Sequence, residues 1–212
     1  MEKNKFLTYF VWLLVILVIA VGAWILSSNN DQGKKADPYT VYNGYVIYKL
    51  ESEKSLRYLV EAYANGGVKY SHYFKFYPSD LLNLSYENGL REKVLYKDVI
   101  NNIKKDKIYF SYDPNMDGAE ILSAGTLIQI LGNSDAGIYK IPVVPSVSQE
   151  TGNNDFPVKT CDDTTESIGV ILMKYGDPII YSEGECVILQ GNNTEEFKRI
   201  NDLLSYILLG VI

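Results

Sequence analysis

The chain has 212 residues, of which 47% are hydrophobic and 22% charged, a composition typical of globular proteins rather than disordered or fibrous ones. Its net charge of -6 argues against nucleic-acid binding, because that function needs a basic surface. One histidine, His72, and two cysteines exclude a four-thiolate zinc site and disfavour Ser-His or Cys-His catalysis within one chain.

An apolar segment near the N-terminus predicts a membrane-spanning helix. Residues 6–30 contain no charge, and the apolar stretch 6–26 would span about 31 Å as an α-helix, the thickness of a bilayer core. We therefore expect residues 6–27 to form a transmembrane signal anchor behind a cytoplasmic flank, 1–5. A signal peptide cleaved near residues 21–23 is the alternative, although apolar residues continue beyond that point.

The flanking lysines do not decide the orientation of this anchor. Lys3 and Lys5 precede it and Lys34 and Lys35 follow it, so the positive-inside rule is balanced. A short flank that leads directly into an apolar run is typical of a secretory signal anchor. We therefore expect a single-pass protein with its N-terminus inside and residues 28–212 extracytoplasmic.

The remaining chain divides into a tether and an α/β (α+β) domain with mixed sheets. Residues 28–38 are polar, lack an aliphatic run and predict a flexible tether. Residues 39–106 are rich in tyrosine and predict a β-dominated subdomain. Residues 107–212 predict an α/β subdomain that ends in an amphipathic helix.

The Tyr-rich part shows strand patterns and one weak helical pattern. Nine tyrosines lie within residues 39–77, where they would suit a half-buried sheet or a stacking platform for sugars or a protein partner. Residues 56–62 also allow a helix start. Strands are expected at 41–50, 56–64 and 68–76, with a hairpin turn at 65–67 and a weak helix at 94–103.

Residues 107–212 alternate between strand and helix patterns, and their order resembles the skeleton of thioredoxin-like domains with one helix replaced by a loop. The Cys-x-x-Cys motif is absent, so redox activity does not follow. Asn193 and Glu196 fit a capping box for the last helix. The expected order is strand 107–112, helix 119–131, strand 138–144, exposed loop 145–160, strands 168–175, 179–181 and 186–190 with a turn at 176–177, and helix 194–209.

Several short motifs of this half resemble extracytoplasmic domains of uncharacterised, membrane-anchored archaeal proteins. The resemblance covers about half of the chain and implies an anchored domain without a known activity. It rests on Tyr112-Asp113-Pro114, Cys161-Asp162, Gly184 to Leu189, and Asn201-Asp202-Leu203-Leu204 running into Leu209-Gly210.

A calcium-loop pattern begins at Asp113. Asp113, Asn115 and Asp117 alternate before a glycine, which would let their oxygens converge on one Ca²⁺. The twelfth position is Ala124, where an EF-hand has a bidentate glutamate. The alternative is a strand-to-helix turn in which Asp117 caps the helix and Glu120 completes a capping box. Calcium is the one cofactor that the sequence suggests.

The two cysteines, Cys161 and Cys186, predict a disulfide. A bond enclosing this loop would stabilise the fold by about 3 kcal/mol. A hairpin centred on residues 176–177 would nevertheless place Cys186 opposite Ser167, away from Cys161. Two buried free thiols are the alternative.

Other polar residues offer weaker signals. Asn83 and Asn192 begin N-x-[ST] sequons and are candidate glycosylation sites. His72 has no evident partner and is expected to serve packing. Acids beside Cys161 are expected to be solvated rather than catalytic: Asp162, Asp163 and Glu166.

Together these features favour a membrane-tethered extracytoplasmic binding or structural module, contacting the membrane through residues 6–27 and a protein or glycan partner through the outer domain. One alternative is an enzyme that uses clustered carboxylates or calcium. A further alternative is a thioredoxin-like redox or chaperone domain that uses the two cysteines.

Overall fold

The structure, a computed structural model, describes residues 38–52, 55–64, 67–150, 152 and 156–212. They belong to one unit, Pro38–Ile212. The predicted flank, the anchor and the tether up to residue 37 lie outside the described residues. Within the described ranges, no helix combines the length and apolar character needed to cross a bilayer.

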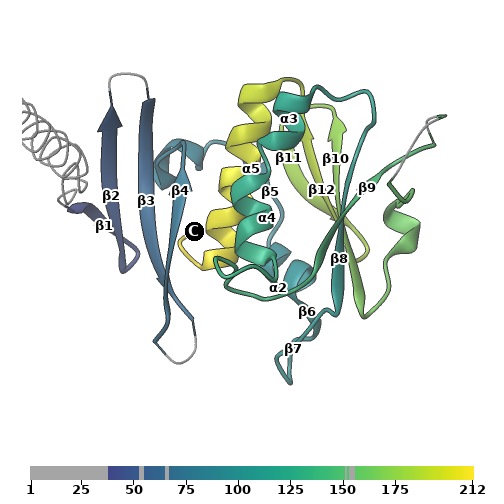
Figure 1. Cartoon of the computed structure of the whole chain (residues 1–212), viewed down its shortest axis with the longest axis horizontal. Coiled ribbons are helices and arrows are strands. Elements are labelled where there is room, and N and C mark those ends of the chain that lie inside the picture. Colours follow the sequence, from purple (N-terminus) through teal and green to yellow (C-terminus); the bar gives the residue numbers. More distant parts are fainter. Residues whose placement is uncertain (1–37, 53–54, 65–66, 151, 153–155) are drawn as a thin grey trace, which may run out of the picture. The chain divides into compact units, whose positions relative to one another are not determined.

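The first part is a four-stranded antiparallel sheet in the order β1-β2-β3-β4 (Figure 1). The predicted single strand 41–50 is wrong, because the left-handed backbone of Asn43 (φ 46°) and Gly44 (φ 85°) forms a hairpin turn there. The strands predicted at 56–64 and 68–76 are confirmed, and the helix alternative is wrong. The strands are β1 (Pro38–Tyr42), β2 (Tyr45–Ser52), β3 (Ser55–Tyr63) and β4 (Lys69–Phe74).

The connection to the second sheet contains short elements. The helix predicted at 94–103 is wrong, since α2 ends at Leu95 and the chain then forms the β6–β7 hairpin. Asp98 starts the turn by accepting hydrogen bonds from Asn101, and the β-branched residues around it favour strand. The elements are η1 (Pro78–Leu81), β5 (Ser85–Tyr86), α2 (Leu90–Leu95), β6 (Tyr96–Asp98) and β7 (Ile103–Lys104).

The second sheet has six strands in the order β5-β11-β12-β10-β8-β9. The predicted hairpin at 176–177 is wrong, because β12 lies between β10 and β11 and runs parallel to β10. The hairpin instead joins β11 to β12 through Gly184, whose φ is 60°. Besides β5, its strands are β8 (Lys107–Tyr112), β9 (Val143–Val147), β10 (Ile168–Tyr175), β11 (Ile179–Glu183) and β12 (Cys186–Gly191).

Three helices stand between the two sheets. The helix predicted at 119–131 is divided into α3 (Gly118–Leu122) and α4 (Gly125–Leu131). The last helix, α5 (Thr194–Leu209), has the predicted bounds. The Asn193 side chain caps α5 as predicted, but the Glu196 carboxylate accepts from the backbone N–H of Asn192 rather than of Asn193.

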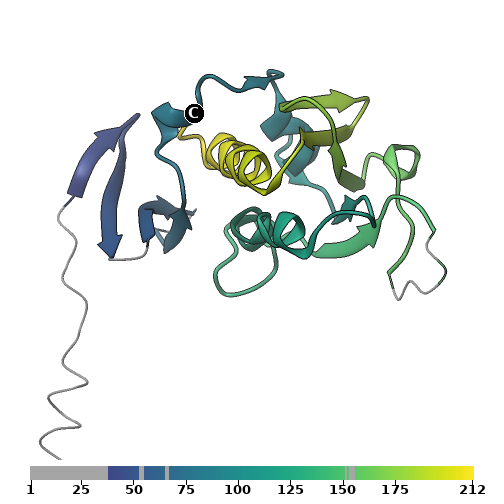
Figure 2. The same ribbon diagram turned by 90° about the horizontal axis from the view of Figure 1, so that it is seen from above.

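The core is built around α5, which lies between the four-stranded sheet and the six-stranded sheet (Figures 1 and 2). The Phe74 ring of β4 stacks on the Tyr206 ring of α5, with centroids 4.0 Å apart. All residues from Ile200 to Leu209 are buried, so the helix is amphipathic only in its first turns. Asn201, Asp202 and Ser205 are therefore buried polar residues on a helix surrounded by protein.

Candidate functional site

A cleft of about 720 Å³ lies between the four-stranded sheet and the helices. The ring of Tyr58 and the buried side chains of Phe74 and Asp202 form its floor. Ser123 and Thr126, from the break between α3 and α4 and the start of α4, form the opposite wall.

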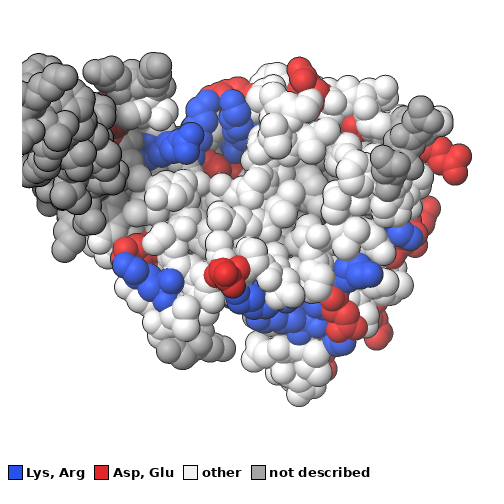
Figure 3. All heavy atoms as spheres, viewed as in Figure 1, with Lys and Arg blue, Asp and Glu red and all other residues white. Residues whose placement is uncertain are grey.

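Basic side chains surround this cleft. Arg57 comes from β3, Lys75 from the residue after β4, and Lys198 from the second turn of α5. Figure 3 shows Lys and Arg atoms gathered around the hollow between the strands and α5, with acidic atoms inside it. This concentration of positive charge contrasts with the net charge of -6 of the whole chain.

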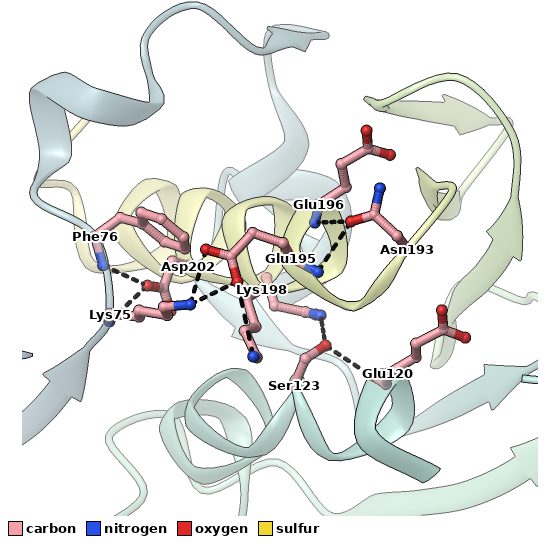
Figure 4. A network of polar contacts seen from close by, with 10 residues as sticks. Lys75, Phe76, Glu120, Ser123, Asn193, Glu195, Glu196, Lys198 and Asp202 are labelled. Carbon is pink, nitrogen blue, oxygen red and sulfur yellow. Dashed lines mark hydrogen bonds and ion pairs between the residues drawn. The ribbon is translucent and has the colours of Figure 1, made fainter. Parts of the chain in front are cut away.

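Two of the cations share one acid. The Lys75 ammonium lies 2.5 Å from Glu195 Oε2, and the Lys198 ammonium lies 3.8 Å from the same oxygen (Figure 4). Glu195 and Lys198 are three residues apart on α5 and therefore lie on one face of the helix. Arg57 is exposed and forms no ion pair with any residue that the structure describes.

Asp202 is the buried acid of the cleft. Its Oδ2 accepts hydrogen bonds from the backbone N–H groups of Lys75 (2.8 Å) and Phe76 (3.1 Å), which leave β4 and need acceptors (Figure 4). Burial raises the pKa of Asp202 to about 7, although both N–H groups act in the opposite direction. The carboxyl therefore changes its charge near neutral pH at the floor of a basic cleft.

The wall opposite is held by a chain of hydrogen bonds. Asn201 Nδ2 on α5 donates to Ser123 Oγ over 2.8 Å, and this hydroxyl donates to the Glu120 carbonyl oxygen over 2.5 Å. Thr126 Oγ1 donates to the carbonyl oxygen of Tyr73 at the edge of the sheet over 3.0 Å. Both sides of the cleft are thereby joined by polar contacts as well as by the core.

The predicted calcium residues lie elsewhere, in the turn between β8 and α3. Asp113 Oδ1 accepts from the backbone and side-chain N–H groups of Asn115, each at 2.9 Å. Asp117 and Glu120 form the reciprocal capping box of α3. Within the described residues, no group of three or more His, Cys, Asp or Glu side chains is arranged to hold a metal. The geometry supports the helix-cap alternative, and calcium binding stays a prediction.

Cys161 and Cys186 form the predicted disulfide, with Cα atoms 5.2 Å apart. The pairing of β12 beside β10 explains how they meet, because it places Cys186 next to Val170 rather than opposite Ser167. The short helix η2 (Cys161–Asp163) contacts β10, the strand beside β12. The Cys186 side chain is fully buried against Val170 and Ile188.

Other predicted residues have local surroundings. His72 is fully buried on β4, where burial lowers its pKa, in agreement with a packing role. Asp163 pairs with Lys159, whose hydrogen bond lowers the pKa of that carboxyl. Asn83 and Asn192, the candidate glycosylation sites, are exposed. The acids Asp162 and Glu166 are exposed too.

Two tyrosines and one arginine donate hydrogen bonds to the C-terminal end of α5. Tyr45 Oη donates to the Leu209 carbonyl oxygen over 2.6 Å, and Tyr139 Oη and Arg91 Nε both donate to that of Leu208. These groups satisfy carbonyls that a helix end leaves unpaired. Of these two tyrosines, only Tyr45 belongs to the Tyr-rich part, and for it the half-buried structural interpretation fits better than the stacking platform.

Sequence reasoning missed the cleft, since Arg57, Lys75 and Asp202 are far apart in the chain. A buried aspartate within an apolar helix stripe is the one signal that could have pointed to it. The chain matches no family model, no curated protein and no solved structure. Its function must therefore be inferred from this geometry.

Proposed function

We propose that the protein is a membrane-tethered extracytoplasmic binding module whose cleft receives an acidic segment of a partner protein. The observation that carries this proposal is the convergence of Arg57, Lys75 and Lys198 on one concave surface of an acidic chain. The N-terminal anchor and the orientation are those expected from the sequence.

The cleft is lined by three cations, Arg57, Lys75 and Lys198, and by two acids, Asp80 and Asp202. Its positive surplus is therefore small and is present while Asp202 is protonated. Glu195 is shared between Lys75 and Lys198, while Arg57 has no acidic partner in the described part of the chain. Asp202 carries only part of a negative charge at neutral pH because its pKa is raised to about 7. A carboxylate-bearing ligand would therefore be attracted to the cleft and oriented there.

The apolar rim favours a peptide over a glycan. Leu56 is 40% exposed and Tyr73 is 50% exposed beside the cationic groups. An acidic glycan offers hydroxyls and carboxylates but no aliphatic side chain to cover Leu56, whereas a peptide offers both kinds of group. The volume of about 720 Å³ lies within the range of ligand sites and suits a few residues of extended chain.

The competing functions have less support. The loop at Asp113 is the place that the sequence suggested for a carboxylate enzyme, and its oxygens serve the turn and the α3 cap. The redox hypothesis needs an accessible thiol, whereas Cys186 is fully buried in a disulfide. A membrane tether would favour binding, because it would confine the cleft near the membrane and raise the effective concentration of the cleft for partners at the same membrane.

The test uses the full chain in nanodiscs and a fluorescent peptide library in which Asp and Glu alternate with Leu and Phe. Arg57→Glu should weaken binding of the selected peptides roughly tenfold, about 1.4 kcal/mol, because it reverses the unpaired charge. Lys49→Glu is the matched control, since Lys49 lies on the same sheet outside the cleft lining.

Two results would contradict the proposal. Equal losses in Arg57→Glu and Lys49→Glu would show general electrostatic attraction rather than a site. Binding of acidic oligosaccharides with no binding of acidic peptides would assign the cleft to a glycan.

A further inference from the structure

The β6–β7 hairpin ends in exposed aliphatic side chains. Val99 is 53% exposed, Ile100 is 92% exposed and Ile103 is 45% exposed. We call these three residues the hairpin tip. In Figure 1 the hairpin extends beyond the six-stranded sheet, away from the helices that cover it. A nearly fully exposed isoleucine with two aliphatic neighbours is a cluster of apolar side chains that the fold leaves in solvent.

The turn holds the hairpin tip in this position. The Asp98 carboxylate accepts hydrogen bonds from the backbone N–H (3.0 Å) and the side-chain amide (2.7 Å) of Asn101. Asn102 takes the left-handed conformation, with φ of 54°. Polar residues thus build the turn, while aliphatic residues occupy the positions that point outward. Because the turn already fixes the backbone, the hairpin tip would lose little conformational entropy on contact with a binding surface.

Lysines stand directly behind the hairpin tip on both strands. Lys97 lies on β6 and pairs with Asp106 (2.6 Å). Lys104 lies on β7 beside Tyr96 in the strand register, and its ammonium donates to the Tyr139 carbonyl oxygen over 2.9 Å. Contact with a lipid phosphate would therefore compete with these two interactions.

Residues 96–107 contain four lysines and two aspartates, but Lys105 is buried and pairs with Glu185. The lysines that remain at the surface, Lys97, Lys104 and Lys107, exceed Asp98 and Asp106 by one charge. Figure 3 shows an uncharged projection at the lower edge of this face, with a band of Lys and Arg atoms above it.

We propose that the hairpin tip inserts into the headgroup region of a bilayer that contains anionic lipids, with Lys97 and Lys104 contacting lipid phosphates. Three aliphatic side chains on a narrow projection offer far less area than a stable protein interface requires, and they lack its aromatic residues. Lipid acyl chains are fluid, so contact with them does not require a protein surface of complementary shape. The aliphatic part of a lysine side chain can lie along an apolar surface while its ammonium group reaches the lipid headgroups.

The contact would be weak by itself and depends on the predicted anchor for its strength. Shallow insertion of a few apolar groups gives reversible binding, as single lipid chains do. The anchor expected at 6–27 and the short tether that follows it would keep the domain near the bilayer, which raises the effective concentration of the hairpin tip. The hairpin tip shares no residue with the cleft, so this inference stands independently of the proposed ligand.

Tryptophan fluorescence of the full chain in nanodiscs tests the insertion. The only tryptophans are Trp12 and Trp24, and replacing both by Phe leaves a background in which Ile100→Trp is a unique reporter. In discs with phosphatidylglycerol, we expect its emission to shift to shorter wavelength and to be quenched by lipids brominated on their acyl chains. Leu122→Trp is the matched control, because Leu122 is 80% exposed on α3 and should keep an unquenched, solvent-like emission.

The lysines are tested in the same background. Lys97→Glu with Lys104→Glu should reduce the quenching of Ile100→Trp, as should discs of pure phosphatidylcholine. Unquenched emission of Ile100→Trp in anionic discs would overturn the proposal, and so would equal quenching of Leu122→Trp. A spectral shift found only in discs that carry two chains would assign the hairpin tip to self-association and would overturn it as well.

Discussion

The cleft and the hairpin tip both lie beside lysine or arginine side chains of an acidic chain, yet they have opposite shapes. The cleft is concave, has aromatic residues and a buried acid at its floor, and lies between elements distant in sequence. The hairpin tip is convex, aliphatic and made of residues that lie within one turn of the chain. Positive charge is common to both regions, so we expect the apolar groups beside it to select the partner. Groups that line a hollow would favour a peptide, and groups on a projection would favour a lipid surface.

Changing the pH should separate the two regions most strongly. The raised pKa of Asp202, about 7 against an ordinary value near 3.9, means that the folded state binds more protons than the unfolded state between these values. The contribution of Asp202 to stability is therefore present at low pH and is lost as the pH rises towards 7, by up to about 4 kcal/mol.

Asp202→Asn keeps an acceptor for the two backbone N–H groups but does not titrate, so the difference between its stability and that of the wild type isolates this effect. Urea unfolding at several pH values measures it. Acidic peptides should also bind the wild type more weakly as Asp202 ionises among Lys75, Lys198, Asp80 and Glu195, while quenching at the hairpin tip stays constant. A stability difference independent of pH would refute the assignment.

Loss of the disulfide should lower the stability of the fold but leave the binding properties of both the cleft and the hairpin tip unchanged. Cys186→Ala should destabilise the fold by about 3 kcal/mol, because the bond restricts the unfolded chain. Neither the cleft nor the hairpin tip contains a cysteine, so both should keep their binding properties under native conditions. Denaturant unfolding measures the loss. Titration of the folded wild type with Ellman's reagent should find no thiol, and two reactive thiols would show that the bond is absent in solution.

Removing the α3 cap should disturb one wall of the cleft. Asp117→Ala removes a capping-box partner and should cost about 1 kcal/mol with or without Ca²⁺. Because Ser123 follows α3 directly, peptide binding should weaken slightly while insertion of the hairpin tip is unchanged. Thermal unfolding with millimolar Ca²⁺ or with a chelator provides the measurement. A calcium-dependent rise in melting temperature that the substitution abolishes would restore the calcium hypothesis.

The smallest effect on stability is expected at the hairpin tip. Ile100→Asp should change the free energy of unfolding by less than about 0.5 kcal/mol, because the side chain is 92% exposed. The same substitution should abolish association with anionic bilayers and leave peptide binding intact. Urea unfolding and a flotation assay together measure both properties. A loss of stability above 1 kcal/mol, on the order of a buried contact, would mean that Ile100 packs within the protein.

Local patterns predicted much of the secondary structure. The Asn65-Gly66-Gly67 signal correctly separated β3 from β4, and Asn193 correctly marked the start of α5. The equally local Asn43-Gly44 signal was overlooked, and it divides the first predicted strand. Turns and caps are predictable because their hydrogen bonds form between residues close in the chain.

Long-range pairing was not predictable in the same way. The insertion of β12 between β10 and β11 depends on which strand edges meet. The sequence of a short apolar strand does not indicate which other strand it will pair with. That insertion also decides how Cys161 reaches Cys186, whose pairing the sequence suggested without a geometry to support it.

The apolar segment 6–26, the polar stretch after it, the acidic balance and the mixed α/β pattern of the rest can be read from the order of residues alone. The enclosure of α5 by protein arises from the packing of distant segments, and it makes Asp202 a buried acid in a cleft lined by three cations. The tertiary structure also leaves Val99, Ile100 and Ile103 in solvent, although their residue types predict burial. The physical reason is that desolvation, charge convergence and apolar exposure belong to an arrangement of distant segments, whereas hydropathy and turn chemistry belong to neighbouring residues.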